Sequence, residues 1–148
     1  GFEPIACSHA LCLETLEHLV DPLDTLISIR DSISDSGRIV VSLPNEATIF
    51  HRLRAIGGNL DAGSFSGEGK HLHLPNLSQA TKFLAQILDI EARCYYISPS
   101  AVGSDSQWVG RILTLIPDTI HQAFADWFPS LYARGFIFLL KKKSPRNE

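Results

Sequence analysis

Two neighbouring stretches decide the fold class of this chain: Leu13-Glu-Thr-Leu-Glu-His-Leu-Val-Asp-Pro22 and, further on, Gly37-Arg-Ile-Val-Val-Ser-Leu-Pro-Asn45. The first continues a short, almost unbroken apolar run at His9–Leu13, which is typical of a strand buried on both faces of a parallel sheet. The second contains the β-branched run Arg38–Leu43, bounded by a glycine and a proline, which also predicts a strand. Between them, Asp21 and the proline after it are suited to begin a helix.

The rest of the chain continues this alternation of strands and helices. The first half is expected to contain a strand at His9–Leu13, a helix from Pro22 that is ended by Ser34–Gly37 with Gly37 as a left-handed stop, a strand at Arg38–Leu43 and a helix over residues 46–56. A glycine- and serine-rich loop follows at Gly57–Lys70. The second half is expected to contain a helix capped by Asn76 or Ser78 whose apolar stripe runs to Leu88, a strand at Ile90–Ile97, two short helices separated by Pro117, and a strand at Gly135–Lys142. Such alternation indicates one α/β domain, or part of one, with a mainly parallel sheet.

The composition is that of an ordinary globular protein, with 148 residues, 45% hydrophobic and 20% charged. The net charge of −3 argues against a nucleic-acid binder, which usually carries a strongly basic surface. No apolar run reaches the roughly 20 residues that a membrane-spanning helix needs. Three cysteines without a CxxC pair are typical of a reducing compartment. We therefore expect a cytoplasmic protein whose partner is neither nucleic acid nor a membrane.

The two stretches resemble the fourth and fifth strands of class I S-adenosylmethionine-dependent methyltransferases. In that family a strand ending in Glu-x-x-Glu-His-Leu-x-Asp-Pro is followed by a helix, a glycine turn and a Val-rich strand ending in Ser-x-Pro-Asn. The segment Lys70-His-Leu-His-Leu-Pro75 also resembles the family. The likeness covers nearly the whole chain, tightly over residues 9–45 and more loosely beyond. It implies a partial Rossmann-like, doubly wound sheet, mainly parallel, with Gly135–Lys142 as a final antiparallel strand.

The resemblance also implies a cofactor and shows what is missing. In the family, residues just after the fourth strand contact the methionine portion of S-adenosylmethionine, which here means Leu13 and Glu14, largely through their backbone. The family's glycine-rich loop after its first strand has no counterpart, because Gly63–Gly69 follows no suitable strand. The chain also lacks methionine, even at position 1. We therefore expect a C-terminal fragment, from the fourth strand onward, that is inactive and binds no cofactor without the N-terminal half of the domain.

Glu14, Glu17 and His18 allow an alternative reading as a metal site. Residues three and four apart can share one face of a helical turn, so two carboxylates and an imidazole could converge on a divalent ion such as magnesium. Some members of the family, including ubiquinone-pathway O-methyltransferases and small-RNA 2′-O-methyltransferases, use Glu-x-x-Glu-His in this way, and His71 or His73 could match the later histidine of the second group. We favour the reading without a metal, in which these residues shape the cofactor pocket.

Histidines and aromatic residues supply the remaining candidates. His18 and His71 are the candidate catalytic residues. An imidazole near the crevice at the carboxyl ends of the strands, where open α/β sheets bind ligands, can act as a general base. His71 and His73 alternate with leucines and could instead pin the loop before them. His9 and His51 are interpreted as structural residues. Core packing is preferred over a substrate-stacking role for a group of aromatic residues at helical spacing, namely Trp108, Phe124, Trp127 and Phe128.

The favoured function is methyl transfer from S-adenosylmethionine to a small-molecule acceptor, with oxygen, nitrogen and carbon all left open as the accepting atom. Two alternatives are a metal-dependent O-methyltransferase and a non-catalytic binding or scaffolding remnant of a methyltransferase. An unrelated nucleotide-binding α/β protein is a third. The sequence upstream of residue 1 would distinguish the enzyme from the scaffolding remnant, because a strand followed by Gly-x-Gly is expected only for the enzyme.

Overall fold

The computed structural model describes residues 6–45, 47–49, 52, 56, 72, 73, 75–97 and 115–143. Four strands form one sheet in the order β1-β2-β4-β3, with bounds β1 Cys7–Leu13, β2 Ile33–Pro44, β3 Leu88–Tyr96 and β4 Gly135–Lys142. The pair β1 and β2 is parallel, whereas β4 runs antiparallel to both of its neighbours, β2 and β3. Three strands therefore point the same way and the last one opposes them. The expected α/β fold, mainly parallel with a final antiparallel strand, is confirmed.

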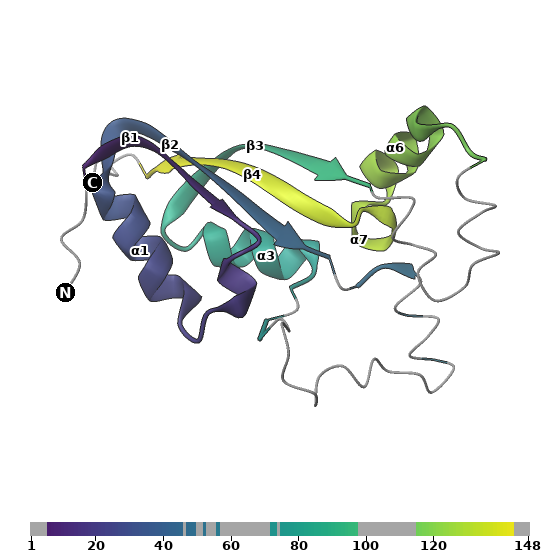
Figure 1. The fold of residues 1–148 in the computed structure, drawn as a ribbon, viewed down its shortest axis with the longest axis horizontal. Coiled ribbons are helices and arrows are strands. Elements are labelled where there is room, and N and C mark those ends of the chain that lie inside the picture. Colours follow the sequence, from purple (N-terminus) through teal and green to yellow (C-terminus); the bar gives the residue numbers. More distant parts are fainter. Residues whose placement is uncertain are drawn as a thin grey trace, which may run out of the picture.

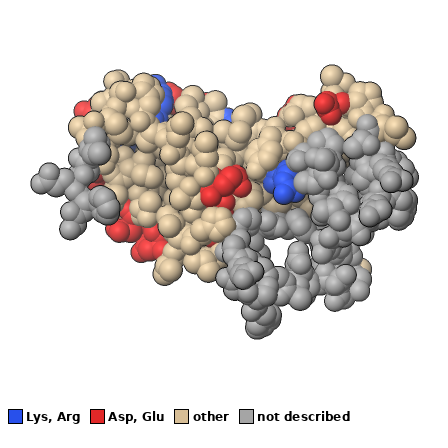
Figure 2. Space-filling model, in the orientation of Figure 1, with Lys and Arg blue, Asp and Glu red and all other residues tan. Residues whose placement is uncertain are grey.

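The helices are α1 Pro22–Ser32, α3 Leu77–Leu84, α6 Asp118–Trp127 and α7 Pro129–Tyr132, together with the 3-10 turn η1 Leu16–His18. Figure 1 shows α1 and α3 on the same face of the sheet, while α6 and α7 lie near one end of it. None of the helices in the described ranges is long and apolar enough to cross a membrane. Figure 2 shows acidic and basic side chains scattered over the described surface of one face, without a large patch of either sign.

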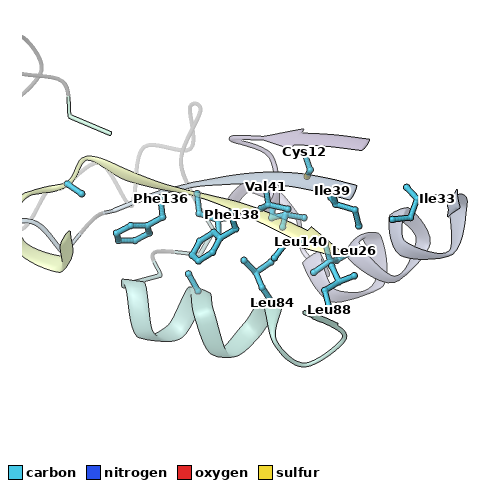
Figure 3. Packing of buried hydrophobic residues seen from close by; sticks show 14 of the residues in the cluster. Cys12, Leu26, Ile33, Ile39, Val41, Leu84, Leu88, Phe136, Phe138 and Leu140 are labelled. Atoms are coloured by element: carbon cyan, nitrogen blue, oxygen red, sulfur yellow. The ribbon is translucent and has the colours of Figure 1, made fainter. Parts of the chain in front are cut away.

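The core lies between the sheet and the layer formed by α1 and α3 (Figure 3). Alternate residues of β2 and β4 point into it because successive side chains of a strand face opposite ways. They meet Leu26 of α1 and Leu84 of α3, both of which have no exposed surface. The strand residues buried in this layer are Ile39, Val41, Leu43, Phe136, Phe138 and Leu140.

The opposite face of the sheet is far less covered. Leu11 and Leu13 of β1 are 72% and 51% exposed, and Cys12 is the strand's one buried residue. The expectation of a strand buried on both faces is therefore wrong for β1. Its apolar run does face two ways, but only the face towards α1 and α3 is covered within the described part of the chain, and β1 is the edge strand there.

Helix ends differ from the sequence-based expectation in two places. Asp21 caps α1 by accepting the Asp24 N–H at 3.0 Å, as expected, but α1 ends at Ser32 and Gly37 lies inside β2. A Cβ on Gly37 would come within 2.4 Å of the Ser8 carbonyl oxygen, so this glycine permits close approach of β1 and β2 instead of ending a helix. Similarly, α3 ends at Leu84, short of the expected Leu88, which begins β3.

Several aromatic side chains of the insertion before β4 lie on the surface. Phe124, Trp127 and Phe128 are 45%, 76% and 52% exposed, so the core-packing interpretation is wrong for these three. The buried residues of α6 are instead His121 and Ala125, and the His121 ring is hydrogen-bonded to the Tyr132 hydroxyl of α7.

Some expectations fall outside the described residues. They concern most of the helix at 46–56, the loop Gly57–Lys70, the first of the two helices around Pro117, and the residues His51, His71 and Trp108.

Candidate functional site

The carboxyl ends of β1, β2 and β3 lie at one edge of the sheet, because these three strands run in the same direction. Ligands of open α/β sheets bind outside this edge. Glu14 follows β1, Ser42 and Asn45 lie at the end of β2, and Tyr96 ends β3. Four polar residues at the ends of three strands therefore lie at the sheet edge where ligands of such folds bind.

Glu14 occupies an unusual backbone conformation at this edge. Its φ of 47° is the one positive value among the described residues other than glycine. The Glu14 N–H donates to the Ser42 hydroxyl oxygen at 2.9 Å, and that hydroxyl donates back to Glu14 Oε1 at 2.8 Å. A positive φ costs a non-glycine residue on the order of 1 kcal/mol, so the surrounding contacts must hold it in place. Such outliers concentrate at functional sites.

Tyr96 contacts the same carboxylate from β3, the strand at the opposite edge of the sheet from β1. Its hydroxyl donates to Glu14 Oε1 at 3.3 Å, although β3 and β1 are separated by β4 and β2. The ring passes over Gly135 of β4, where a Cβ would lie 2.4 Å from the ring and the hydroxyl oxygen. Partial burial and then the negative charge of Glu14 raise the pKa of Tyr96 to about 12. The phenol therefore remains a neutral donor throughout the physiological pH range.

Glu17 and His18 lie on η1, which follows Glu14 and Thr15 in the chain. The Glu17 carboxylate is fully buried, and His18 Nε2 lies 3.8 Å from Glu17 Oε1 with 40% of its side chain exposed. The Glu17 carbonyl accepts the N–H groups of Leu72 and His73 at 2.7 and 3.1 Å. The His73 Nε2 also lies 2.9 Å from the Leu19 carbonyl oxygen. This histidine therefore contacts the motif loop directly, which agrees with the pinning role considered for it.

A cavity of about 360 Å³ adjoins this motif on the helix-covered side of the sheet. Its lining is mostly apolar, and its polar residues are Glu17, His73 and Gln79. The main lining residues are Leu16, Glu17, Leu43, Leu72, His73 and Phe83. Its volume falls within the range of small-ligand pockets.

The structure does not bring the three residues of the metal alternative together. Glu14 is exposed and hydrogen-bonded to Ser42 and Tyr96, while the Glu17 side chain is fully buried. Within the described ranges, no three His, Cys, Asp or Glu side chains are arranged to hold a metal ion. The reason is local: Thr15 separates the left-handed residue from the 3-10 turn, so positions 14 and 17 do not share a helical face.

Asn45 links the end of β2 to the α7 region. Its side chain is buried, and Nδ2 donates to the carbonyl oxygens of Pro129 and Ser130, both at 3.3 Å, and of Ala133 at 2.8 Å. Its Oδ1 accepts the Ala47 N–H at 3.0 Å. Asn45 therefore joins α7 to the end of β2, and Ser42 is the β2 residue that contacts Glu14.

Ser42 and Tyr96 were not among the sequence-based candidates. Ser42 stands in the Ser-x-Pro-Asn motif that carried the resemblance, so that motif held a usable signal. Tyr96 offered a weaker one: it lies near the carboxyl end of a predicted strand, where the ends of parallel strands meet.

Comparisons with known proteins add little to this geometry. Neither a protein-family model nor a curated protein matches the sequence. One solved structure with a similar fold is a loganic acid methyltransferase with SAH, at 10% identity and a TM-score of 0.46. The match covers 99% of this chain and 64% of the other, so the chain spans less than two thirds of that protein's length.

Proposed function

We propose that this chain is part of a protein that transfers a methyl group from S-adenosylmethionine to a small-molecule acceptor. The observation that carries the proposal is the strained Glu14 at the carboxyl edge of the sheet, within the motif that resembles the class I methyltransferases. Backbone outliers of this kind concentrate at functional sites, and the carboxyl edge is where open α/β sheets bind their ligands.

The residues around Glu14 fit a cofactor with a polar amino-acid end. Leu13 is half exposed beside it, and the Glu14 N–H is already engaged by Ser42. Contacts to the cofactor would therefore come from the Glu14 side chain and from the apolar surface of Leu13, more than from the Glu14 N–H. S-adenosylmethionine, when bound, supplies an electrophilic methyl group. The contribution of the chain is to hold and orient the donor and the acceptor.

His18 is the proposed general base for the acceptor, with His71 as a second candidate. The His18 imidazole is partly exposed, so an acceptor could reach it, and its Nε2 lies 3.8 Å from Glu17 Oε1. Once an acceptor is found by screening small molecules with labelled cofactor, His18→Gln should lower kcat by roughly 100-fold with little change in cofactor affinity. His9→Gln, at an exposed histidine of β1, is the matched control.

We also propose that the chain forms the domain from its fourth strand onward. The edge position of β1 and the exposure of Leu11 and Leu13 support this, because additional strands and helices would cover them. The sequence-based expectation of a cytoplasmic protein stands as part of the same proposal.

Calorimetric titration with S-adenosylhomocysteine tests both parts. The protein as its gene encodes it should bind with micromolar affinity, and the 148-residue chain alone should show no binding. Micromolar binding by the chain alone would contradict the fragment proposal. A folded complete protein that binds no cofactor would instead favour the scaffolding alternative.

A further inference from the structure

The proposed function assigns no ligand to the cavity next to η1. Its least exposed lining residues, each no more than 3% exposed, are Leu16, Glu17, Leu43 and Ala80. Leu72 also lines it but is 59% exposed, so the cavity opens to solvent beside this residue. Protein interiors are close-packed, so a cavity of about 360 Å³ that reaches buried residues is typical of a ligand site.

Hydrogen bonds hold the walls of this cavity in place. The Glu17 carbonyl oxygen accepts the N–H groups of Leu72 and His73 at 2.7 and 3.1 Å. The His73 imidazole adds a contact of 2.9 Å from Nε2 to the Leu19 carbonyl oxygen. On another side, a capping box of two reciprocal side-chain hydrogen bonds fixes the first turn of α3, which supplies Gln79 to the lining. Because these walls are fixed in advance, a ligand can bind with little reorganisation.

The polar residues of the lining supply both a donor and an acceptor. The Gln79 side-chain oxygen accepts the Asn76 N–H at 3.0 Å, so its NH₂ group is the part that can donate to a ligand. The two oxygens of the buried Glu17 carboxyl group can accept several hydrogen bonds, so a ligand can be added to its contact with His18. A hydroxyl group donates and accepts, and can therefore use either group or both. An ionic group fits poorly, because moving an ion into a mostly apolar cavity is costly.

We propose that this cavity binds a small uncharged alcohol or phenol, with an apolar part of one or two rings and a single hydroxyl group. The rings lie against Leu16, Leu43 and Phe83, and the hydroxyl group contacts Glu17. The volume sets the size, because it is near the lower end of the range of small-ligand pockets. The inference goes beyond the proposed function and does not depend on it, since this binding requires no cofactor.

Methyl NMR spectroscopy of the complete protein locates the site, with 2-naphthol as the probe. Saturable ring-current shifts are expected at the methyl groups of Leu16, Leu43 and Leu72, which line the cavity. The methyl groups of Leu11 and Leu13, on the less covered face of the sheet, should not shift. Saturable shifts that omit the three cavity leucines, or no saturable shift at all, would overturn the proposal.

Matched ligands test the hydroxyl group. The wild type should bind 2-naphthol at least about fivefold more tightly than naphthalene, as expected for one buried hydrogen bond, and at least about tenfold more tightly than the charged 2-naphthoate. Glu17→Met should lose the preference for 2-naphthol over naphthalene while it still binds naphthalene, which shows that its cavity is intact. Equal binding of 2-naphthol and naphthalene by the wild type, or an unchanged preference in Glu17→Met, would contradict the assigned contact.

A cavity-filling variant tests the same site by a second route. Ala80→Met should weaken the binding of 2-naphthol at least about tenfold, because the longer side chain occupies the space of the ligand. Ala123→Met, at an exposed alanine of α6, is the matched control and should bind like the wild type. Wild-type affinity in a folded Ala80→Met would contradict the proposal. If thermal melting shows that a variant is unfolded, the shift pattern and ligand preference of the wild type decide.

A separate calorimetric titration with S-adenosylhomocysteine keeps this inference distinct from the proposed function. Cofactor binding by a protein that does not take 2-naphthol into the cavity would overturn the inference and leave the proposed function standing. Binding of 2-naphthol in the cavity without any cofactor binding would support the inference and count against the proposed function.

Discussion

Tyr96 couples the proposed site to the stability of the protein. Its pKa is raised to about 12 in the folded state, from an unfolded value near 10, so the folded state favours the neutral phenol. The corresponding stability is fully present below about pH 10 and is lost as the pH rises through about 12. We expect the free energy of unfolding of Tyr96→Phe to fall less than that of the wild type between about pH 9 and about pH 11.5, as measured by urea unfolding.

The control for this experiment is internal. Burial also raises the pKa of Tyr132, which is present in both proteins, so its contribution cancels in the difference. Parallel pH profiles for the two proteins would contradict a raised pKa at Tyr96.

Asn45 is the second single residue with a large expected effect. Its side-chain amide donates to three carbonyls of the α7 region, and the Ala133 contact is buried. Asn45→Ala leaves these acceptors without their donor, which should cost about 1–3 kcal/mol of the free energy of unfolding. Asn45→Asp keeps the acceptor for the Ala47 N–H but places a charge beside the carbonyls, so it should cost more. Faster amide hydrogen exchange in α7 is the local readout, and wild-type exchange in Asn45→Ala would contradict this role.

Among the elements, α3 has the best-defined beginning. The Asn76 side chain accepts the Gln79 N–H, and the Gln79 side chain accepts the Asn76 N–H, both at 3.0 Å, which forms a capping box. Asn76→Ala should lower the free energy of unfolding by about 1 kcal/mol, as measured by urea denaturation. Ser78→Ala, at an exposed position in the first turn of the helix whose side chain does not form the cap, should have an effect within about 0.5 kcal/mol of zero. Equal losses in the two variants would mean that the cap contributes little.

The sequence correctly predicted the helix and strand boundaries that depend on residues close by in the chain. Asp21 caps α1 and the final strand has the predicted bounds, because capping chemistry and apolar runs depend on neighbouring residues. The role of Gly37 was missed because its reason is a contact with Ser8 on another strand. The end of α3 was misplaced because apolar residues continue at helical spacing into the turn before β3.

The candidate site was predictable only in part, for the same reason. Glu14 follows from the motif and from its place at a strand end. Its partners depend on which strands lie side by side, and β4, the last strand in the chain, lies between β2 and β3. Nothing local in the sequence indicates that Tyr96 would reach over Gly135 to Glu14. Glu14 and Glu17 do not share a helical face, and this too depends on a single positive φ.

At the scale of the whole molecule, the sheet is asymmetric. One face carries α1, α3 and the core, while the other exposes apolar side chains of β1, which is also an unpaired edge in the described part of the chain. Exposed edges with apolar residues promote association between molecules. The same surface is where the proposed remaining strands of the domain would pack.

This asymmetry predicts that the 148-residue chain self-associates in a concentration-dependent manner when it is produced alone. Leu11→Lys should shift sedimentation profiles towards the monomer, because a lysine on an edge strand opposes pairing with another chain. Val20→Lys adds the same charge at a residue that is 89% exposed but outside the sheet, so it should leave association unchanged. An equal reduction by both variants would indicate a general effect of charge. A wild-type chain that stays monomeric at high concentration would contradict the proposed pairing of further strands at this edge.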